Sequence, residues 1–154
     1  MKRRHFLKRS ALAATAAALP ALAQTSTRFQ PAQDIRPLLD EITKGAAIGE
    51  GGIEVKLPAL AENGNSVPMQ VKVDHAMTPE NYVAAIHIIA ERNPRPRVAS
   101  FHLRPESGRA EISTRVRLAG TQKVTVLAEM SNRTFRMTQT EVVVTSAACL
   151  DESM

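Results

Sequence analysis

The sequence contains a single cysteine, Cys149, close to the C-terminal Met154. A thiol reacts as its thiolate, and a free cysteine has a pKa of about 8.5, so a modest fraction is nucleophilic near neutral pH. The small residues 146–148 precede the cysteine. A thiol on such an arm can carry a covalently bound group into the active site of another protein. The sequence therefore predicts Cys149 as a site of covalent substrate attachment.

No catalytic constellation accompanies this thiol. The patterns of a nucleophile elbow, a phosphate-binding loop and a dinucleotide-binding turn are all absent from the sequence. Asp151 and Glu152 follow the cysteine and disfavour its thiolate slightly, which argues against a thiol tuned for catalysis. We therefore predict that the protein is not an enzyme and has no catalytic residues of its own.

Three histidines follow the N-terminal region, His75, His87 and His102, and no two of them have the spacing of metal ligands. His87 lies in an apolar run, which is typical of a hydrogen-bonded core residue. We predict no metal site and no cofactor. A three-histidine metal site is the alternative, if the fold brings the three side chains together.

Residues 1–23 resemble a twin-arginine export signal. Arg3 and Arg4 precede a Phe-Leu-Lys stretch, a short alanine-rich run follows, and Ala-Leu-Ala at residues 21–23 is a cleavage pattern. The apolar run is shorter than the ~20 residues of a membrane span. The sequence therefore predicts a periplasmic protein with no membrane association after cleavage. An odd cysteine in an exported protein indicates a reactive thiol or a bond to another molecule.

The charge balance gives no support for nucleic-acid binding. Five of the 20 basic residues lie in residues 1–23, so the mature chain has 15 basic and 15 acidic residues. The aromatic residues form no base-stacking pattern. The arginine-rich segment 92–117 is expected to decorate the solvent-facing sides of strands, and a docking face is the alternative.

The apolar periodicity predicts one helix followed by an all-β body. Ile35, Leu38, Leu39 and Ile42 indicate a helix within residues 30–45, with Asp34 as its cap and Gly45 as its end. Glycines at positions 49, 51 and 52 predict a flexible turn. Alternating apolar residues then predict seven strands: 53–57, 67–73, 82–91, 99–103, 112–118, 124–130 and 135–145. This number and spacing favour an immunoglobulin-like β-sandwich.

Residues 82–91 have a second interpretation. They are apolar at both even and odd positions, as a central strand would be, and Thr78-Pro79-Glu80 is also a typical helix start. We predict a strand because the surrounding sequence is β-rich, and a helix over residues 79–91 is the alternative.

Several segments of the body resemble one known family. These are Leu57-Pro58, Ala61-Glu62-Asn63-Gly64-Asn65, Val67-Pro68, Tyr82-Val83, Ile86-His87-Ile88, Ala90-Glu91, Asn93-Pro94, Val98-Ala99, Phe101-His102, Ser113-Thr114-Arg115, Arg117-Leu118-Ala119 and Ala128-Glu129-Met130-Ser131. With the export signal, they resemble SoxY, the sulfur-carrier subunit of the periplasmic thiosulfate-oxidising system.

The resemblance implies a fold and a set of partners. It implies an immunoglobulin-like sandwich that forms a heterodimer with a SoxZ-like sandwich subunit. It also implies that thiosulfate-derived sulfur, held on Cys149, is processed by periplasmic enzymes such as a c-type cytochrome thiol oxidase and a sulfate thiohydrolase. The expected organisation is a signal at 1–23, a helical extension at 24–50, a SoxY domain at 51–145 and a carrier-type tail at 146–154.

The tail departs from the family pattern, which ends in Gly-Gly-Cys-Gly-Gly. Here Ala147 and Ala148 precede the cysteine, and Leu150 and Asp151 follow it. Glycines give a carrier arm its backbone freedom. The alternative function is therefore a diverged, non-catalytic binding subunit that pairs with a SoxZ-like partner without carrying sulfur.

Overall fold

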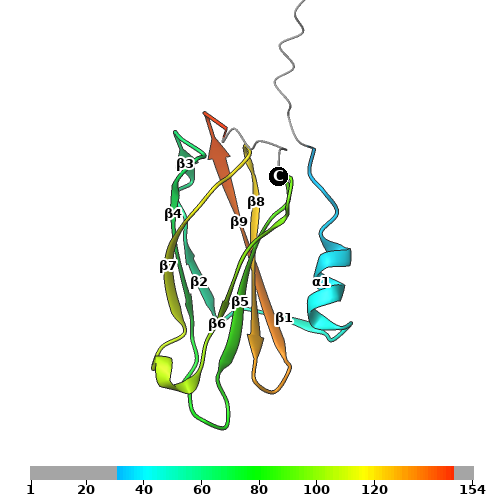
Figure 1. Cartoon of the computed structure of the whole chain (residues 1–154), viewed down its shortest axis with the longest axis vertical. Helices are drawn as coiled ribbons and strands as arrows, with labels where there is room; N and C mark the ends of the chain where they lie inside the picture. Colours follow the sequence, from blue (N-terminus) through cyan, green and yellow to red (C-terminus); the bar gives the residue numbers. More distant parts are fainter. Residues whose placement is uncertain (1–30, 148–154) are drawn as a thin grey trace, which may run out of the picture.

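The computed structural model of the chain describes residues 31–147. They form two β-sheets that face each other, with the helix α1 (Arg36–Thr43) against the outer side of the larger sheet (Figure 1). The predicted all-β sandwich with one short helix before it is confirmed.

The strands belong to a larger and a smaller sheet. In chain order they are β1 (Ile48–Glu50), β2 (Ile53–Lys56), β3 (Leu60–Ala61), β4 (Val67–Val73), β5 (Val83–Ala90), β6 (Arg97–His102), β7 (Glu111–Val116), β8 (Gln122–Met130) and β9 (Phe135–Val144). The larger sheet has the order β1-β9-β8-β5-β6, and β3 also pairs with β9; the smaller sheet has the order β2-β4-β7. The pairings of β1 and β3 with β9 are parallel, and the others are antiparallel.

All seven predicted strands are present, and two short strands were missed. The predicted turn at glycines 49, 51 and 52 is wrong at its first residue, because Gly49 lies in β1 and pairs with Arg136 of β9. Gly51 and Gly52 do form a turn, and their φ angles of 86° and 70° are in the region that favours glycine. The second missed strand, β3, consists of two residues only.

The core lies between the two sheets. In β4 every second residue is buried, and these side chains meet Ile86 and Ile88 of β5 across the sandwich. Each buried aliphatic side chain of this size stabilises the fold by about 1.5–3 kcal/mol. Nearly all of β5 is buried because α1 covers part of its other face. The predicted strand is confirmed, and the alternative helix over residues 79–91 is wrong.

Helix α1 covers the outer face of the larger sheet through Leu39. This side chain is buried against Ile89 of β5, Leu127 of β8 and Phe135 of β9. Arg97 of β6 also forms an ion pair of 3.0 Å with Glu41 of the helix. The helix therefore closes a second, smaller apolar cluster outside the main core.

The ends of α1 differ from the prediction by one residue each. The N-cap position is Ile35, and the Asp34 carboxylate accepts a hydrogen bond from the Arg36 backbone N–H at 3.0 Å. Hydrogen bonds from the Arg36 side chain and backbone lower the pKa of Asp34 to about 2. The helix ends at Thr43, and its C-cap residue is Lys44, whose φ of 56° is left-handed, with Gly45 after it.

Candidate functional site

The predicted attachment residue, Cys149, lies outside the described residues. The structure does describe residues 145–147, which precede it. Residues 145–147 leave the end of β9 at one end of the sandwich. This end is also formed by the loops 62–66, 91–96 and 117–121. We call it the tail end.

Backbone hydrogen bonds fix the chain as it leaves β9. The Thr145 N–H donates to the Ala61 carbonyl oxygen at 3.1 Å, which continues the parallel pairing of β9 with β3. The Ser146 carbonyl oxygen accepts from the Gly64 N–H at 2.7 Å, and the Gly64 carbonyl oxygen accepts from the Leu118 N–H at 2.8 Å. Gly64 is buried and joins the root of the tail to the segment after β7.

Two threonine hydroxyls add side-chain contacts at this root. The Thr121 hydroxyl oxygen accepts a hydrogen bond from the Val144 N–H at 3.0 Å, and the Thr145 hydroxyl donates to the Glu62 carbonyl oxygen at 3.2 Å. An extended chain advances by about 3.5 Å per residue, so the three residues from Ser146 to Cys149 span at most about 10 Å of chain.

Asn93 holds two loops of the tail end together. Its side-chain amide donates to the Arg117 carbonyl oxygen at 2.8 Å. Its side-chain oxygen accepts from the Ala119 N–H at 3.0 Å and from the Gln122 side chain at 3.1 Å. Asn93 is only 6% exposed, so these bonds satisfy polar groups that would otherwise be buried without partners.

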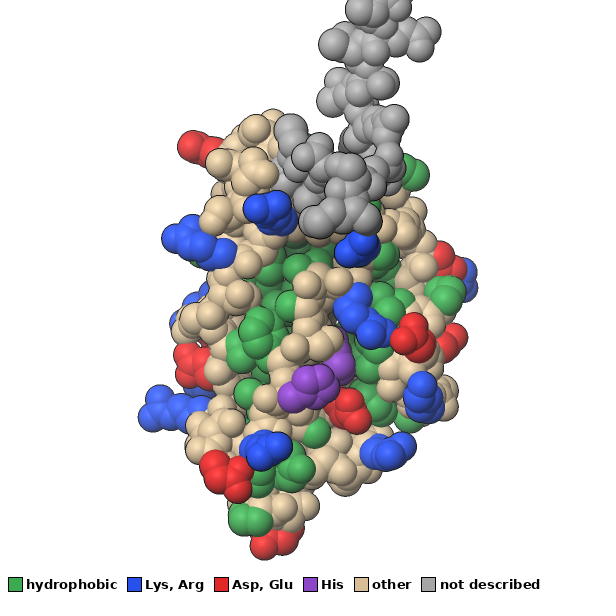
Figure 2. Space-filling view, in the orientation of Figure 1, with side chains coloured by type: hydrophobic (Ala, Val, Ile, Leu, Met, Phe, Trp, Pro, Cys, Tyr) green, Lys and Arg blue, Asp and Glu red, His purple; other side chains and the backbone are tan. Residues whose placement is uncertain are grey.

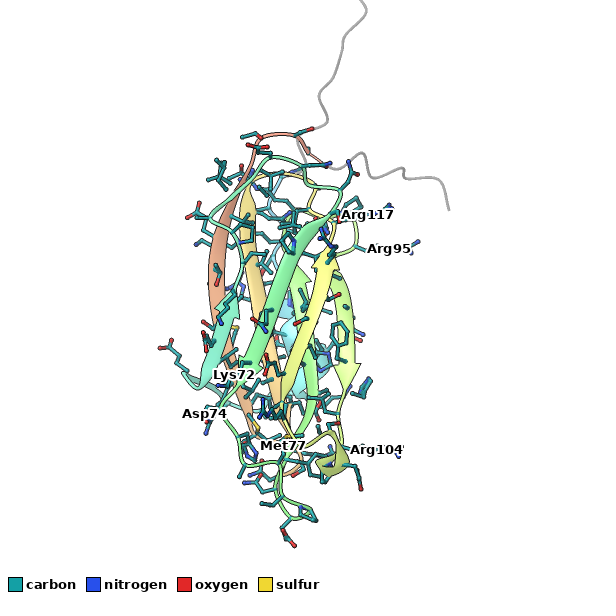
Figure 3. The ribbon with its side chains drawn as sticks, turned by 90° about the vertical axis from the view of Figure 1, so that its left-hand side faces the viewer. Lys72, Asp74, Met77, Arg95, Arg104 and Arg117 are labelled. Carbon is teal, nitrogen blue, oxygen red and sulfur yellow. The ribbon has the colours of Figure 1, made fainter. Side chains whose placement is uncertain are left out.

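The tail end is rich in positive charge. Its loops, together with Arg115 at the end of β7, carry four arginines and two glutamates: Arg92, Arg95, Arg115, Arg117, Glu62 and Glu91. Figure 3 shows Arg95 and Arg117 at this end of the molecule and Arg104 at the other. We call the four arginines the arginine cluster. Within residues 31–147, the Arg117 side chain is exposed and makes no hydrogen bond or ion pair.

Two exposed apolar side chains lie beside the root of the tail. Leu60 of β3 is 56% exposed, and its partner in register, Val143 of β9, is 44% exposed. They are the exposed large hydrophobic residues of the described chain. Single exposed apolar residues are ordinary on a protein surface, and here the two are adjacent to each other.

The histidines lie away from the tail end. His87 of β5 and His102 of β6 are neighbours on the outer face of the larger sheet, with ring centroids 6.4 Å apart. Figure 2 shows histidine side chains near the middle of one face of the molecule, beside an acidic side chain. His75 accepts a hydrogen bond from the Met77 N–H in the loop after β4. Among the described residues, no group of three or more His, Cys, Asp or Glu side chains is arranged to hold a metal ion.

His87 is buried, as its apolar surroundings in the sequence indicated. Its Nδ1 atom is 2.8 Å from the Ser100 hydroxyl oxygen, and its Nε2 atom is 3.8 Å from a Glu129 carboxylate oxygen. Burial lowers the pKa of His87, and the Glu129 carboxylate opposes this shift. The neutral imidazole therefore acts as a structural residue of the sheet.

These features define a one-domain β-sandwich with a basic end, from which a cysteine-containing tail leaves. A family model described as "Sulfur oxidation protein SoxY" matches residues 39–149, a range that includes Cys149. The chain belongs to the SoxY family. Among curated proteins, no sequence matches the chain.

Solved structures with the same fold include a SoxY protein. The sulfur carrier protein SoxY from Chlorobium limicola f thiosulfatophilum has a TM-score of 0.59 and 28% identity, and the match covers 70% of this chain and 93% of that one. A superoxide reductase (neelaredoxin) from Ignicoccus hospitalis has a TM-score of 0.55 and 11% identity, over 61% of this chain and 80% of that one. The second likeness shows a shared fold alone. The match to SoxY confirms the immunoglobulin-like sandwich.

Sequence reasoning found the thiol and missed the organisation around it. It assigned the arginines of segment 92–117 chiefly to the solvent-facing sides of strands. Arg97 and Arg115 do occupy exposed positions of β6 and β7. Arg92, Arg95 and Arg117 lie in loops, and the structure brings them to the same end as Arg115, where the tail begins. The sequence carried no local signal for this, because the arrangement depends on Asn93, which is buried and bonds to the segment after β7.

Proposed function

We propose that the protein is a periplasmic sulfur carrier that holds thiosulfate-derived sulfur covalently on Cys149. The observation that carries this proposal is the SoxY family match, which extends through Cys149. The fixed root at Thr145 and Ser146 supports it, because a rigid body with a short tail can present a thiol at a defined distance. The tail itself supplies no catalytic group, so the chemistry belongs to partner enzymes.

Loading would join the Cys149 sulfur to the outer sulfur of thiosulfate. The thiolate and thiosulfate form a new S–S bond and release two electrons, which a c-type cytochrome thiol oxidase accepts. A sulfate thiohydrolase then adds water across the terminal S–S bond, which releases sulfate and two protons and leaves a persulfide on Cys149. After these two steps Cys149 is a persulfide and not yet the free thiol.

We infer that residues 1–23 are a twin-arginine signal that directs export to the periplasm. The mature protein would consist of the extension at 24–50, the domain at 51–145 and the tail at 146–154, paired with a SoxZ-like sandwich subunit. Within residues 31–147, no helix is both long and apolar enough to cross a membrane.

The test is the intact mass of the exported protein, purified with its partner, after incubation with thiosulfate and the partner oxidase. We expect a mass increase of one thiosulfate-derived unit that a thiol reductant removes and that maps to Cys149. Cys149→Ser is the matched control and should show no increase. An unmodified wild-type thiol under conditions that load a carrier with a glycine-rich tail would contradict the proposal.

The tail sequence favours one second candidate, a binding subunit that does not carry sulfur. Leu150 is bulky, and Asp151 and Glu152 repel anionic sulfur compounds. In that case a SoxZ-like partner would co-purify equally well with wild type and Cys149→Ser, and neither would acquire sulfur. Loss of thiosulfate-dependent activity in Cys149→Ser would rule this candidate out.

A further inference from the structure

The tail and the end from which it leaves carry opposite charges. Residues 148–154 contain Asp151 and Glu152 and no basic residue. The tail end carries the arginine cluster, with four arginines against two glutamates. At the other end of the sandwich, the loops 74–82, 103–110 and 131–134 carry three arginines and three acidic residues: Arg104, Arg109, Arg133, Asp74, Glu80 and Glu106. The excess of arginines therefore lies at the end where the acidic tail starts.

The length of the tail brings these charges within reach of one another. Asp151 follows Ala147 by four residues, so its Cα atom lies within about 14 Å of the last described residue. The root is bonded to Gly64, and Gly64 is bonded to Leu118, the residue after Arg117. Two backbone hydrogen bonds therefore connect the start of the tail, through Gly64, to the segment that contains Arg117.

Arg117 precedes Leu118 in the chain, and Arg115 lies two residues earlier on the same exposed side. The buried side chains of Val116 and Leu118 point into the core, and the two arginines alternate with them and are exposed. The Arg115 guanidinium donates to the Ser66 hydroxyl oxygen at 3.3 Å, which draws it toward the loop that holds the tail root. Two neighbouring guanidinium groups can form ion pairs with two neighbouring carboxylates, one with each.

We propose that Asp151 and Glu152 form ion pairs with Arg115 and Arg117, which gives the tail a docked position on the body of the protein. Exposed ion pairs are individually weak and are screened by salt, so the docked and free positions of the tail exchange readily. In the docked position the arginines neutralise the two carboxylates beside Cys149. The docking itself does not depend on sulfur binding, and its effect on carriage rests on the proposed function.

The single cysteine allows a direct test by electron paramagnetic resonance. A nitroxide label on Cys149 of the full mature chain should show a restricted component at low salt. This component should fall about threefold in 1 M NaCl, where the Debye length is about 3 Å. The charge reversal Asp151→Lys with Glu152→Lys should cause the same loss at low salt, because the carboxylates are gone.

The reciprocal reversal makes the assignment specific. Arg115→Glu with Arg117→Glu should also release the label, and combining both pairs of reversals should restore the restricted component. Arg104→Glu, at the opposite end, is the matched control and should leave the spectrum unchanged. Thermal unfolding shows whether the arginine variants fold. If the arginine variants do not fold, the charge reversal in the tail still tests the proposal.

Three outcomes would overturn the docking. One is a label that is equally mobile in wild type and in the tail reversal. Another is a restricted component that the tail reversal leaves intact while the arginine reversal removes it, since the arginines would then hold something else. The third is a combined variant that stays mobile. None of these readouts involves thiosulfate, so they are independent of the mass measurement that tests carriage.

Discussion

The two ends of the sandwich are built in different ways. At the tail end, side-chain hydrogen bonds join residues 23 to 83 positions apart, through Asn93, Thr121 and Thr145. At the opposite end, most turn side chains bond to residues two or three positions away, as in Thr78 with Asn81. The tail end is therefore joined by several side-chain hydrogen bonds between distant segments, while the opposite end relies mainly on bonds within single turns, with the bond from the Tyr82 N–H to the Ser131 hydroxyl joining two of them. A substitution at the tail end should disturb several segments at once.

The largest difference should appear when a turn asparagine is removed at each end. Asn93→Ala leaves the Arg117 carbonyl, the Ala119 N–H and the Gln122 side chain without their partner in a buried site. We expect the free energy of unfolding to fall by about 2–4 kcal/mol, measured by denaturant titration. Asn132→Ala removes two exposed bonds to Thr134 and should cost less than about 1 kcal/mol. Equal losses would show that the ends do not differ.

Hydrogen exchange should separate the two ends in the unaltered protein. The amides of Gly64 and Leu118 bond across segments at the tail end, so their exchange requires a wide opening. The amides of Asn81 and Arg133 close short turns and should exchange roughly a hundredfold faster. Similar rates for the two pairs would contradict the picture of a connected tail end.

A pair of threonine-to-valine changes gives a smaller contrast. Thr121→Val keeps the shape of the side chain and removes the acceptor of the Val144 N–H at the end of β9. It should lower the free energy of unfolding by about 1 kcal/mol. Thr134→Val removes only the exposed bond to Asn132 and should cost about 0.5 kcal/mol or less. If Thr134→Val were the more costly change, the comparison would be reversed.

Mild acid, down to pH 5.5, should act on the middle of the larger sheet through His87. Burial lowers the pKa of His87 in the folded state, while Glu129 favours the charged imidazole, and His102 and Arg97 disfavour it. The unfolded chain therefore binds this proton first as the pH falls. Stability should be lost below the unfolded pKa of about 6.5, by at most about 1 kcal/mol down to pH 5.5.

His87→Gln cannot titrate and should remove this pH dependence of the melting temperature. Asn93→Ala and Asn132→Ala should both keep it, because the histidine lies between the two ends. A pH dependence that survives in His87→Gln would assign it to another group.

Local patterns in the sequence predicted the body of the fold. Alternation identified β4 from Val67 to Val73, and a continuous apolar run identified β5, because the side-chain period of a strand is a local property. Strands β1 and β3 were missed because each is short and is defined by parallel pairing with the distant β9. No local pattern records such a pairing.

The candidate site shows the same division. The thiol at Cys149 and the acidic residues after it could be read directly from the sequence. The gathering of the arginine cluster could not, because it depends on the bonds of Asn93 to Arg117 and Ala119. Its charge becomes informative only when the fold places it beside the root of the tail.

The position of β9 also determines how the protein responds to mechanical force. Near its end β9 is paired on one edge with β8, where Val142 faces Gln122, and on the other with β3, where Val143 faces Leu60. A pull on the tail acts along the strand, so the perpendicular bonds to the antiparallel β8 and the slanted bonds to the parallel β3 are loaded together in shear. Peeling would instead break them one at a time. A force applied to the tail is therefore shared by the bonds on both edges of β9.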